Sequence, residues 1–146
     1  MKTLAYPLIQ QYIEPSPLVL TKPQRRRQIK ATLKTPQVRY HQSANLLWLS
    51  GNSTEQGKSE TWSEINEIME EHLERNEKLN MVLDLRKINH QSIIALMHAF
   101  NNLKNGFRNG KDIIVTWMIS LVNDEMMELA FEMSALYGIK IEIRPY

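Results

Sequence analysis

Hydrophobic residues change their spacing along the chain, and each spacing predicts a kind of element. Short stretches rich in β-forming residues at 38–40 and 46–50 predict two strands, joined as a hairpin by a polar link. From 59 to 75 the spacing becomes helical, with apolar residues every three or four positions and charges between them: Trp62, Ile65, Met69 and Leu73. This segment therefore predicts an amphipathic helix.

The run 79–85 is short and almost continuously apolar, which predicts a strand buried on both faces. Helical spacing returns in 92–106, and Gly106 stands where a glycine commonly ends a helix. The sequence therefore predicts a buried strand followed directly by a second helix.

The last third of the chain repeats this alternation. A strand is predicted at 112–118, then a third helix that is acidic in its first turn and ends near Gly138, then an alternating strand at 139–143. The predicted order is ββαβαβαβ. Such alternation is typical of an α/β domain with a mixed, mostly parallel sheet and helices packed on it.

Charge and proline content separate the first 34 residues from the rest. Residues 1–34 hold seven Lys or Arg, one acid and four of the six prolines, whereas residues 35–146 carry a net charge of −4. The sequence predicts a basic, flexible N-terminal extension at 1–34 and a single α/β domain at 35–146.

The cations of the extension gather near its end, and two interpretations of them stay open. The cluster is a solvated leader, or it contacts nucleic acid, anionic lipid or an acidic partner. No uninterrupted apolar stretch predicts a signal peptide or a membrane span, and the chain contains no cysteine, so we expect a protein of the cytoplasm. The cations in question are Arg25, Arg26, Arg27 and Lys30.

Patterns that could carry enzyme chemistry fail on spacing. In the segment 51–59, five residues separate Gly51 from Gly57, where a phosphate-binding loop needs four, so we expect a plain loop with Ser59 capping the first helix. No serine-nucleophile motif is present, and the four histidines lack metal-ligand spacing: His41, His72, His90 and His98. We therefore expect no enzyme, no metal and no cofactor.

Polar residues occupy the junction between the 79–85 strand and the second helix. Asn89 is a good helix cap, able to accept from the backbone N–H of Gln91 or Ser92. The helix N-terminus also favours a phosphate, and Ser92 is the one hydroxyl at the junction. The residues alone favour a cap over a phosphorylation site.

Several short motifs are arranged as in a known family. An opening pattern TP-V, then L-I-SG-S, has its counterpart in Thr35-Pro36-x-Val38 and Leu47-x-Leu49-Ser50-Gly51-x-Ser53. The segment LDLRKINHQSIIAL is similar to one in which a strand leads to NTSS and a helix. A Trp, an acidic loop and a DM-E helix start correspond to Trp117, Asp124, Glu125, Met126 and Glu128. Together the motifs resemble the SiaC-type regulatory phosphoproteins of bacteria, which are STAS-like in shape.

The resemblance implies a signalling adaptor without an active site. In that family the threonine of NTSS accepts a phosphate, which a dedicated kinase adds and a PP2C-like phosphatase removes. The unmodified form binds and activates a diguanylate cyclase, so phosphorylation controls cyclic-di-GMP output and biofilm behaviour. A phosphate dianion within such an interface breaks the contact through repulsion and desolvation.

This chain departs from the family at the switch itself. His90 stands at the threonine position and Gln91 at the next, and only Ser92 is retained. We expect a degenerate site in which Asn89 caps the helix and Ser92 is the fallback phosphoacceptor. The expected partner surface comprises Asn89, Gln91, Asp124 and Glu125. The alternative function is a nucleic-acid or other interaction module led by the basic extension.

Overall fold

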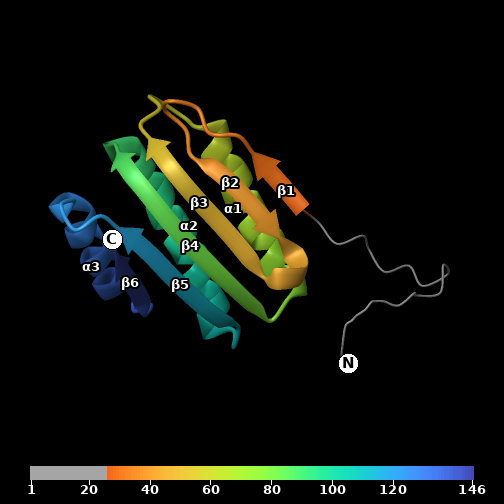
Figure 1. Ribbon diagram of the computed structural model, residues 1–146. Coiled ribbons are helices and arrows are strands. Elements are labelled where there is room, and N and C mark those ends of the chain that lie inside the picture. The colour runs from red at the N-terminus through yellow and green to blue at the C-terminus, as the bar shows by residue number, and fades with distance from the viewer. Residues whose placement is uncertain (1–25) are drawn as a thin grey trace.

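The computed structural model describes residues 26–146, which form one mixed sheet with helices packed against it (Figure 1). The strands are β1 (Arg26–Ile29), β2 (Gln37–His41), β3 (Leu46–Ser53), β4 (Lys78–Ile88), β5 (Asp112–Ile119) and β6 (Ile141–Pro145). The helices are the short 3-10 helix η1 (Gln42–Ala44), α1 (Glu60–Arg75), α2 (His90–Arg108) and α3 (Asp124–Tyr137).

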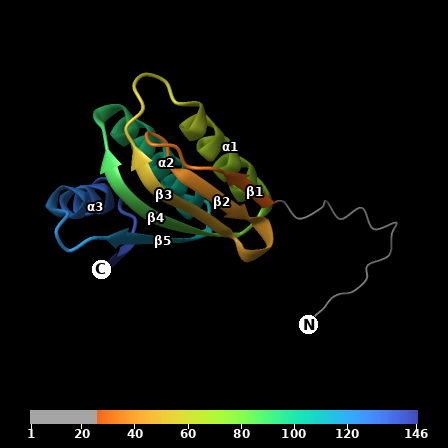
Figure 2. The same cartoon turned by 45° about the horizontal axis from the view of Figure 1, so that its top comes forward.

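The strands lie in the sheet in their chain order, from β1 to β6. β1, β2 and β3 pair antiparallel, whereas β3, β4, β5 and β6 pair parallel. Each parallel connection carries one helix, and α1, α2 and α3 all cover the same face of the sheet (Figures 1 and 2). The predicted α/β class and the mixed, mostly parallel sheet are confirmed.

The core lies between this face and the helices. Leu47, Met81 and Val115 are neighbours across three strands, and all are buried. Burial alternates along β4, however, so every second residue of that strand is only half-buried. The prediction that β4 is buried on both faces is wrong, because no described helix covers the second face of the sheet.

The first strand was not predicted. β1 pairs with β2, with Arg27 opposite Tyr40, so the sheet begins within the segment assigned to a flexible extension. The prediction of flexibility is wrong for this strand, whose pairing depends on the free edge of β2 and not on a hydrophobic pattern of its own. Residues 1–25, and the prediction made for them, lie outside the described residues.

Gly106 does not end α2, contrary to the sequence-based expectation. The helix continues to Arg108 with Gly106 buried inside it, and a β-carbon there would lie 3.3 Å from a methyl carbon of Leu73. The glycine therefore allows α2 to approach α1 closely. The turn comes later, at Gly110, whose φ of +85° suits a residue without a side chain.

His72 joins α1 to the neighbouring strands from a buried position. Its Nε2 donates to the Lys78 carbonyl at 2.8 Å, so its Nδ1 is the atom that accepts from the Tyr40 hydroxyl at 2.6 Å. Burial lowers the pKa of His72, outweighing the Lys78 hydrogen bond that raises it, and the charge of Lys111 lowers it further. The ring is therefore a neutral structural element.

No helix within residues 26–146 is long and apolar enough to cross a membrane.

Candidate functional site

The loops that follow β3, β4 and β5 lie together at the carboxyl ends of these strands, because the three strands are parallel. Asn89 fixes the second of these loops. Its side-chain oxygen accepts from the Ser92 N–H at 2.9 Å, which confirms the predicted cap, and its amide nitrogen donates to the Glu55 carbonyl at 3.0 Å. The start of α2 is thereby tied to the loop after β3.

A buried hydrogen-bond chain lies beneath this cap. The Trp62 indole N–H donates to the Ser53 hydroxyl at 2.7 Å, and Ser53 donates to the Ser92 hydroxyl at 2.6 Å. These three side chains are at most 4 % exposed. Together they hold the ends of β3, α1 and α2 in one arrangement.

The Ser92 side chain points into the domain, where a kinase acting on the surface cannot reach it. Its hydroxyl is part of the buried chain, so a phosphate on it requires this packing to open. His90 and Gln91 are exposed, by contrast, on the first turn of α2. We call residues 89–91 the α2 ridge. Within it Asn89 is held by hydrogen bonds, whereas His90 and Gln91 are accessible to solvent.

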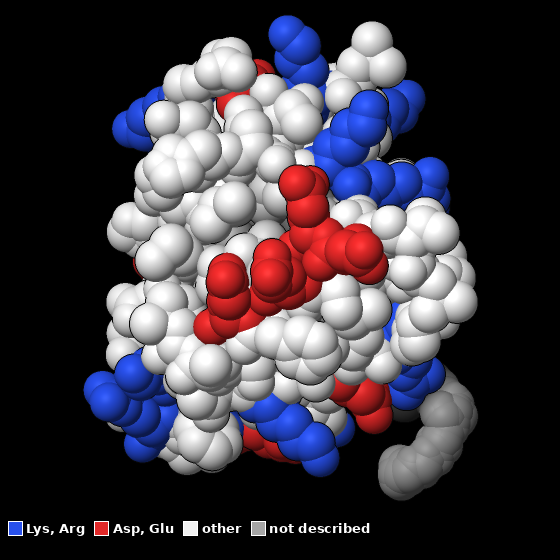
Figure 3. All heavy atoms as spheres, turned by 90° about the vertical axis from the view of Figure 1, so that its left-hand side faces the viewer, with Lys and Arg blue, Asp and Glu red and all other residues white. Residues whose placement is uncertain are grey.

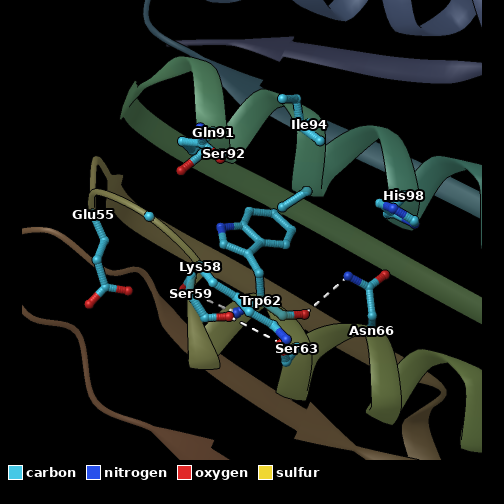
Figure 4. Close-up of a pocket in the computed structure, with 12 residues that line it drawn as sticks. Glu55, Lys58, Ser59, Trp62, Ser63, Asn66, Gln91, Ser92, Ile94 and His98 are labelled. Atoms are coloured by element: carbon cyan, nitrogen blue, oxygen red, sulfur yellow. Dashed lines mark hydrogen bonds between the residues drawn. The ribbon is translucent and has the colours of Figure 1, made fainter.

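A groove lies on each side of the α2 ridge. The α1–α2 groove encloses about 400 Å³ and is lined by Trp62, Gln91, Ile94 and His98 among others. In Figure 4 the Trp62 indole lies between the two helices, whereas Glu55 points away from the groove. Ile94 is 43 % exposed, so this groove offers apolar surface beside the ridge.

The α2–α3 groove lies on the other side and encloses about 660 Å³. Its lining includes Lys87 and Ile88 from the end of β4 and Glu125 from the start of α3. Asn123 caps α3 by accepting from the Met126 N–H at 3.2 Å, and it donates to the Arg86 carbonyl at 3.1 Å. The second cap therefore ties α3 to the end of β4, as Asn89 ties α2 to the loop after β3.

The structure brings only part of the predicted acidic surface to the ridge. Glu125 lines the α2–α3 groove, but Asp124 is not among its lining residues, although both are exposed. They begin a row of exposed carboxylates on α3, visible as the red band across Figure 3, that continues with Glu128 and Glu132. Within the described part of the chain none of these four makes an ion pair.

The described residues of the predicted basic cluster lie in or next to β1, at the opposite edge of the sheet from β6. Arg27 donates to Glu64 of α1 and forms an ion pair with it, whereas Lys30 is exposed after β1. The backbone of Arg26 belongs to β1, and Arg25 lies outside the described residues. Arg27 and Lys30 therefore do not contribute to the α2 ridge.

Sequence reasoning missed two members of the site. The motif Leu47-x-Leu49-Ser50-Gly51-x-Ser53 predicts no role for Ser53, and the helical spacing predicts Trp62 only as an apolar residue of a helix. The signal for both was present, because a buried indole N–H and a buried hydroxyl need partners, and Ser53 precedes the loop that leads to α1. Ser59 caps α1 as predicted, accepting from the Trp62 N–H at 3.3 Å.

Nothing in the described part of the chain resembles a metal centre. No three histidine, aspartate or glutamate side chains of residues 26–146 lie close enough to share an ion.

Comparison with known proteins finds one family model that matches this domain and several solved structures that share its fold. The model for the SiaC family regulatory phosphoproteins matches residues 29–146. No protein with a curated description matches the chain. Apo-SiaC from Pseudomonas aeruginosa superposes with a TM-score of 0.74 at 22 % identity, covering 82 % of this chain and 98 % of that one.

Two further structures from the same organism give the same fold. SiaC of Pseudomonas aeruginosa has a TM-score of 0.77 at 22 % identity, with 84 % of this chain and 99 % of that chain covered. The diguanylate cyclase SiaD in complex with its activator SiaC gives a TM-score of 0.77 at 23 % identity, with coverages of 82 % and 98 %.

Proposed function

The chain belongs to the SiaC family of regulatory phosphoproteins, and from that premise we propose that it is a non-enzymatic signalling adaptor of the cytoplasm. It docks on a partner protein through the α2 ridge and the two grooves beside it. The observation that carries this proposal is the position of His90. It is exposed at the N-terminus of α2, where the family resemblance places the phosphoacceptor, above the buried Trp62–Ser53–Ser92 hydrogen bonds.

The partner is a diguanylate cyclase. The support comes from a relative, since SiaC of Pseudomonas aeruginosa is the activator of the diguanylate cyclase SiaD and shares this fold. The exposed apolar surface at Ile94 and the mixed charges around Lys87 and Glu125 suit a protein surface better than a small anionic ligand. Activation is then a binding event, and the chain itself needs no catalytic group.

The side chain at position 90 determines whether this surface carries negative charge. A phosphothreonine there would bring nearly two negative charges to the ridge, whereas a histidine carries no negative charge. His90 cannot accept a stable O-phosphate. This chain therefore stays in the form that, by the family resemblance, binds the cyclase.

Ser92 is a structural residue in this account and not a second switch. Its hydroxyl accepts from Ser53 in a site that is 4 % exposed. A phosphate at this position would have to displace the Trp62–Ser53–Ser92 chain, leaving buried donors without partners. The retained serine supports the ridge from below.

Capture from the native cell tests the proposed partner. Tagged wild-type protein should enrich a diguanylate cyclase, identified by mass spectrometry, and the variant His90→Glu should lose that enrichment because it places a permanent negative charge on the ridge. Asn101→Glu is the matched control, since Asn101 is exposed further along α2.

Two outcomes would contradict the proposal. Wild-type capture without any diguanylate cyclase would remove the assigned partner. Equal capture by wild type and His90→Glu would show that binding does not involve the ridge.

The nucleic-acid alternative is left with a weaker basis. Arg27, one of the four basic residues on which it depended, is paired with Glu64, which reduces the charge available to phosphates. A gel-shift assay of the full chain at low salt decides it, because binding led by cations would appear there and weaken steeply as salt is added.

A further inference from the structure

The carboxyl end of α2 extends beyond the end of α3. Phe100 of α2 packs near Tyr137, the last residue of α3, with their ring centroids 5.9 Å apart. Phe107 follows Phe100 by seven residues, so it stands on the same side of α2, two turns or about 10 Å further along. α3 has already ended at that point, and Phe107 is left 59 % exposed. α2 thus reaches the lower end of the domain in Figure 1 with an uncovered apolar ring.

A second exposed apolar side chain comes from the last turn of α3. Leu136 precedes Tyr137 and is also 59 % exposed. The contact between Phe100 and Tyr137 holds this turn against α2, so Leu136 and Phe107 belong to the same end of the two helices. Neither side chain lines the α1–α2 groove or the α2–α3 groove. Apolar side chains that gather on a surface in this way mark a contact with another macromolecule or with a membrane.

The residues around Phe107 carry positive charge. The segment 104–111 contains Lys104, Arg108 and Lys111 and no acid. Lys111 is held in an ion pair, whereas Lys104 and Arg108 form none within residues 26–146. Two unpaired cations therefore flank the exposed ring in the last turns of α2.

Lys140 brings a third cation to the same end of the domain. It is exposed in the turn that joins α3 to β6, and the next residue, Ile141, pairs with Val115 of β5. Gly106 of α2 lies against Ile113 of the same strand. Lys140 and the last turns of α2 are thus level with the beginning of β5. Lys and Arg side chains are visible along the lower end of the molecule in Figure 3.

Carboxylates border this end of the domain. Asp112 opens β5, and Glu132 ends the acidic row of α3 one turn before Leu136. In the described part of the chain neither forms an ion pair with a cation. Between them lie residues that are either apolar and exposed or basic and unpaired. We call these residues the basal patch: Lys104, Phe107, Arg108, Leu136 and Lys140.

We propose that the basal patch docks on the surface of a bilayer that contains anionic phospholipids. The three cations contact the lipid phosphates, and the two apolar side chains enter the boundary between headgroups and acyl chains. Anionic headgroups attract Lys and Arg, while apolar side chains gain free energy when they leave water. The long stems of Lys and Arg also let their charges reach the headgroups while the apolar residues beside them are buried. The contact is peripheral.

The length of α2 separates this surface from the α2 ridge. The 19 residues of the helix span about 28 Å, with His90 at one end and Arg108 at the other. A bilayer at the basal patch therefore leaves the ridge facing away from the lipid. The two surfaces can be occupied at the same time, so this proposal does not depend on the proposed function. Each fails or stands on its own measurement.

Co-sedimentation of the full chain with lipid vesicles tests the contact. Wild-type protein should bind vesicles that contain phosphatidylglycerol, should bind vesicles of phosphatidylcholine alone much less, and should be released by salt. Lys104→Glu combined with Arg108→Glu should lower the partition coefficient by about 30-fold or more, because each cation near an anionic surface contributes about fivefold. Phe107→Ser combined with Leu136→Ser should lower it on both kinds of vesicle.

Matched variants at the opposite end of the sheet are the controls. Lys34→Glu combined with Lys58→Glu makes the same change in net charge, and Leu121→Ser combined with Val122→Ser removes two other exposed apolar side chains. All four residues are exposed, so both variants should keep the fold. Both should bind the anionic vesicles as wild type does.

Three results would overturn the proposal. The first is no binding of the wild-type protein to vesicles that contain phosphatidylglycerol. The second is binding that the basal-patch variants keep or that the control variants lose to the same extent, since the contact would then lie elsewhere in the chain. The third is a dimer in sedimentation velocity that Phe107→Ser combined with Leu136→Ser converts into a monomer, because a second copy would then cover the patch.

Discussion

A single hydroxyl, that of Ser53, joins three elements beneath the α2 ridge. It accepts from the Trp62 indole at 2.7 Å and donates to Ser92 at 2.6 Å. The cap of α2 could be predicted from Asn89 alone, since a polar residue before an apolar helical pattern is a local signal. The Ser53–Ser92 contact joins residues 39 positions apart, and no local pattern encodes it.

Replacing Ser53 should therefore destabilise the domain. Ser53→Ala leaves the buried Trp62 N–H without a partner, at a cost of about 1 to 3 kcal/mol in the free energy of unfolding. Chemical denaturation measures the change, with Ser63→Ala on the exposed side of α1 as control. In combination with Trp62→Phe, the Ser53→Ala cost should shrink. Simple additivity of the two substitutions would contradict the coupling.

The variant Ser92→Ala distinguishes a structural role of Ser92 from a role as phosphoacceptor. The variant should lose stability, because Ser53 loses its acceptor, yet it should capture the same partner as wild type. Mass spectrometry of the peptide that contains Ser92, from native cells and without acid in the workup, is the complementary measurement. Phosphate on this serine would contradict its structural role.

His72 makes stability depend on pH. Its pKa in the folded state lies below the value of 6.5 for a free side chain, chiefly because of burial. Below pH 6.5 the unfolded state therefore binds more protons, and stability falls as the pH drops through this region. Urea midpoints between pH 5 and 8 should show this slope in wild type and a shallower one in His72→Gln. An equal slope in both proteins would exclude His72 as its source.

At the scale of elements, the sequence predicts the three α-helices of residues 26–146 but not the short helix η1, nor how the helices share the sheet. The strands lie in chain order, and crossovers of one hand then place all three helices on one face. The apolar run in β4 suggested burial on both faces, whereas Val82 and Asp84 on its second face are half-buried. β1 carries no hydrophobic signal, since its pairing comes from the neighbouring edge.

Gly106 also shows that a local sequence pattern does not predict packing between elements. A glycine near the end of a helical pattern favours a stop, but here it is the point where α2 contacts Leu73 of α1. Gly106→Val should overpack this contact and cost about 1 to 3 kcal/mol of stability. Asn105→Val is the matched control, because Asn105 is exposed on the same helix turn. Similar thermal midpoints for the two variants would contradict tight packing at Gly106.

At the scale of the whole molecule, the caps at Asn89 and Asn123 fix the starts of α2 and α3, which border the proposed docking surface. The Asn89 side chain binds the Glu55 carbonyl in the loop after β3, and the Asn123 side chain binds the Arg86 carbonyl of β4. These bonds hold the backbone at the α2 ridge and at the start of α3 in place. The family resemblance predicts the switch position, and the residue found there is a histidine, which has no hydroxyl to form an O-phosphate. Which side chains line the grooves beside it depends on helix packing, which the sequence does not display.

The rate of cyclic-di-GMP synthesis by the captured cyclase tests the central claim most directly. Purified wild-type protein and Asn101→Glu should both raise this rate, and His90→Glu should raise it far less because its carboxylate interrupts the docked ridge. Equal activation by wild type and His90→Glu would contradict the claim that this chain acts through the α2 ridge.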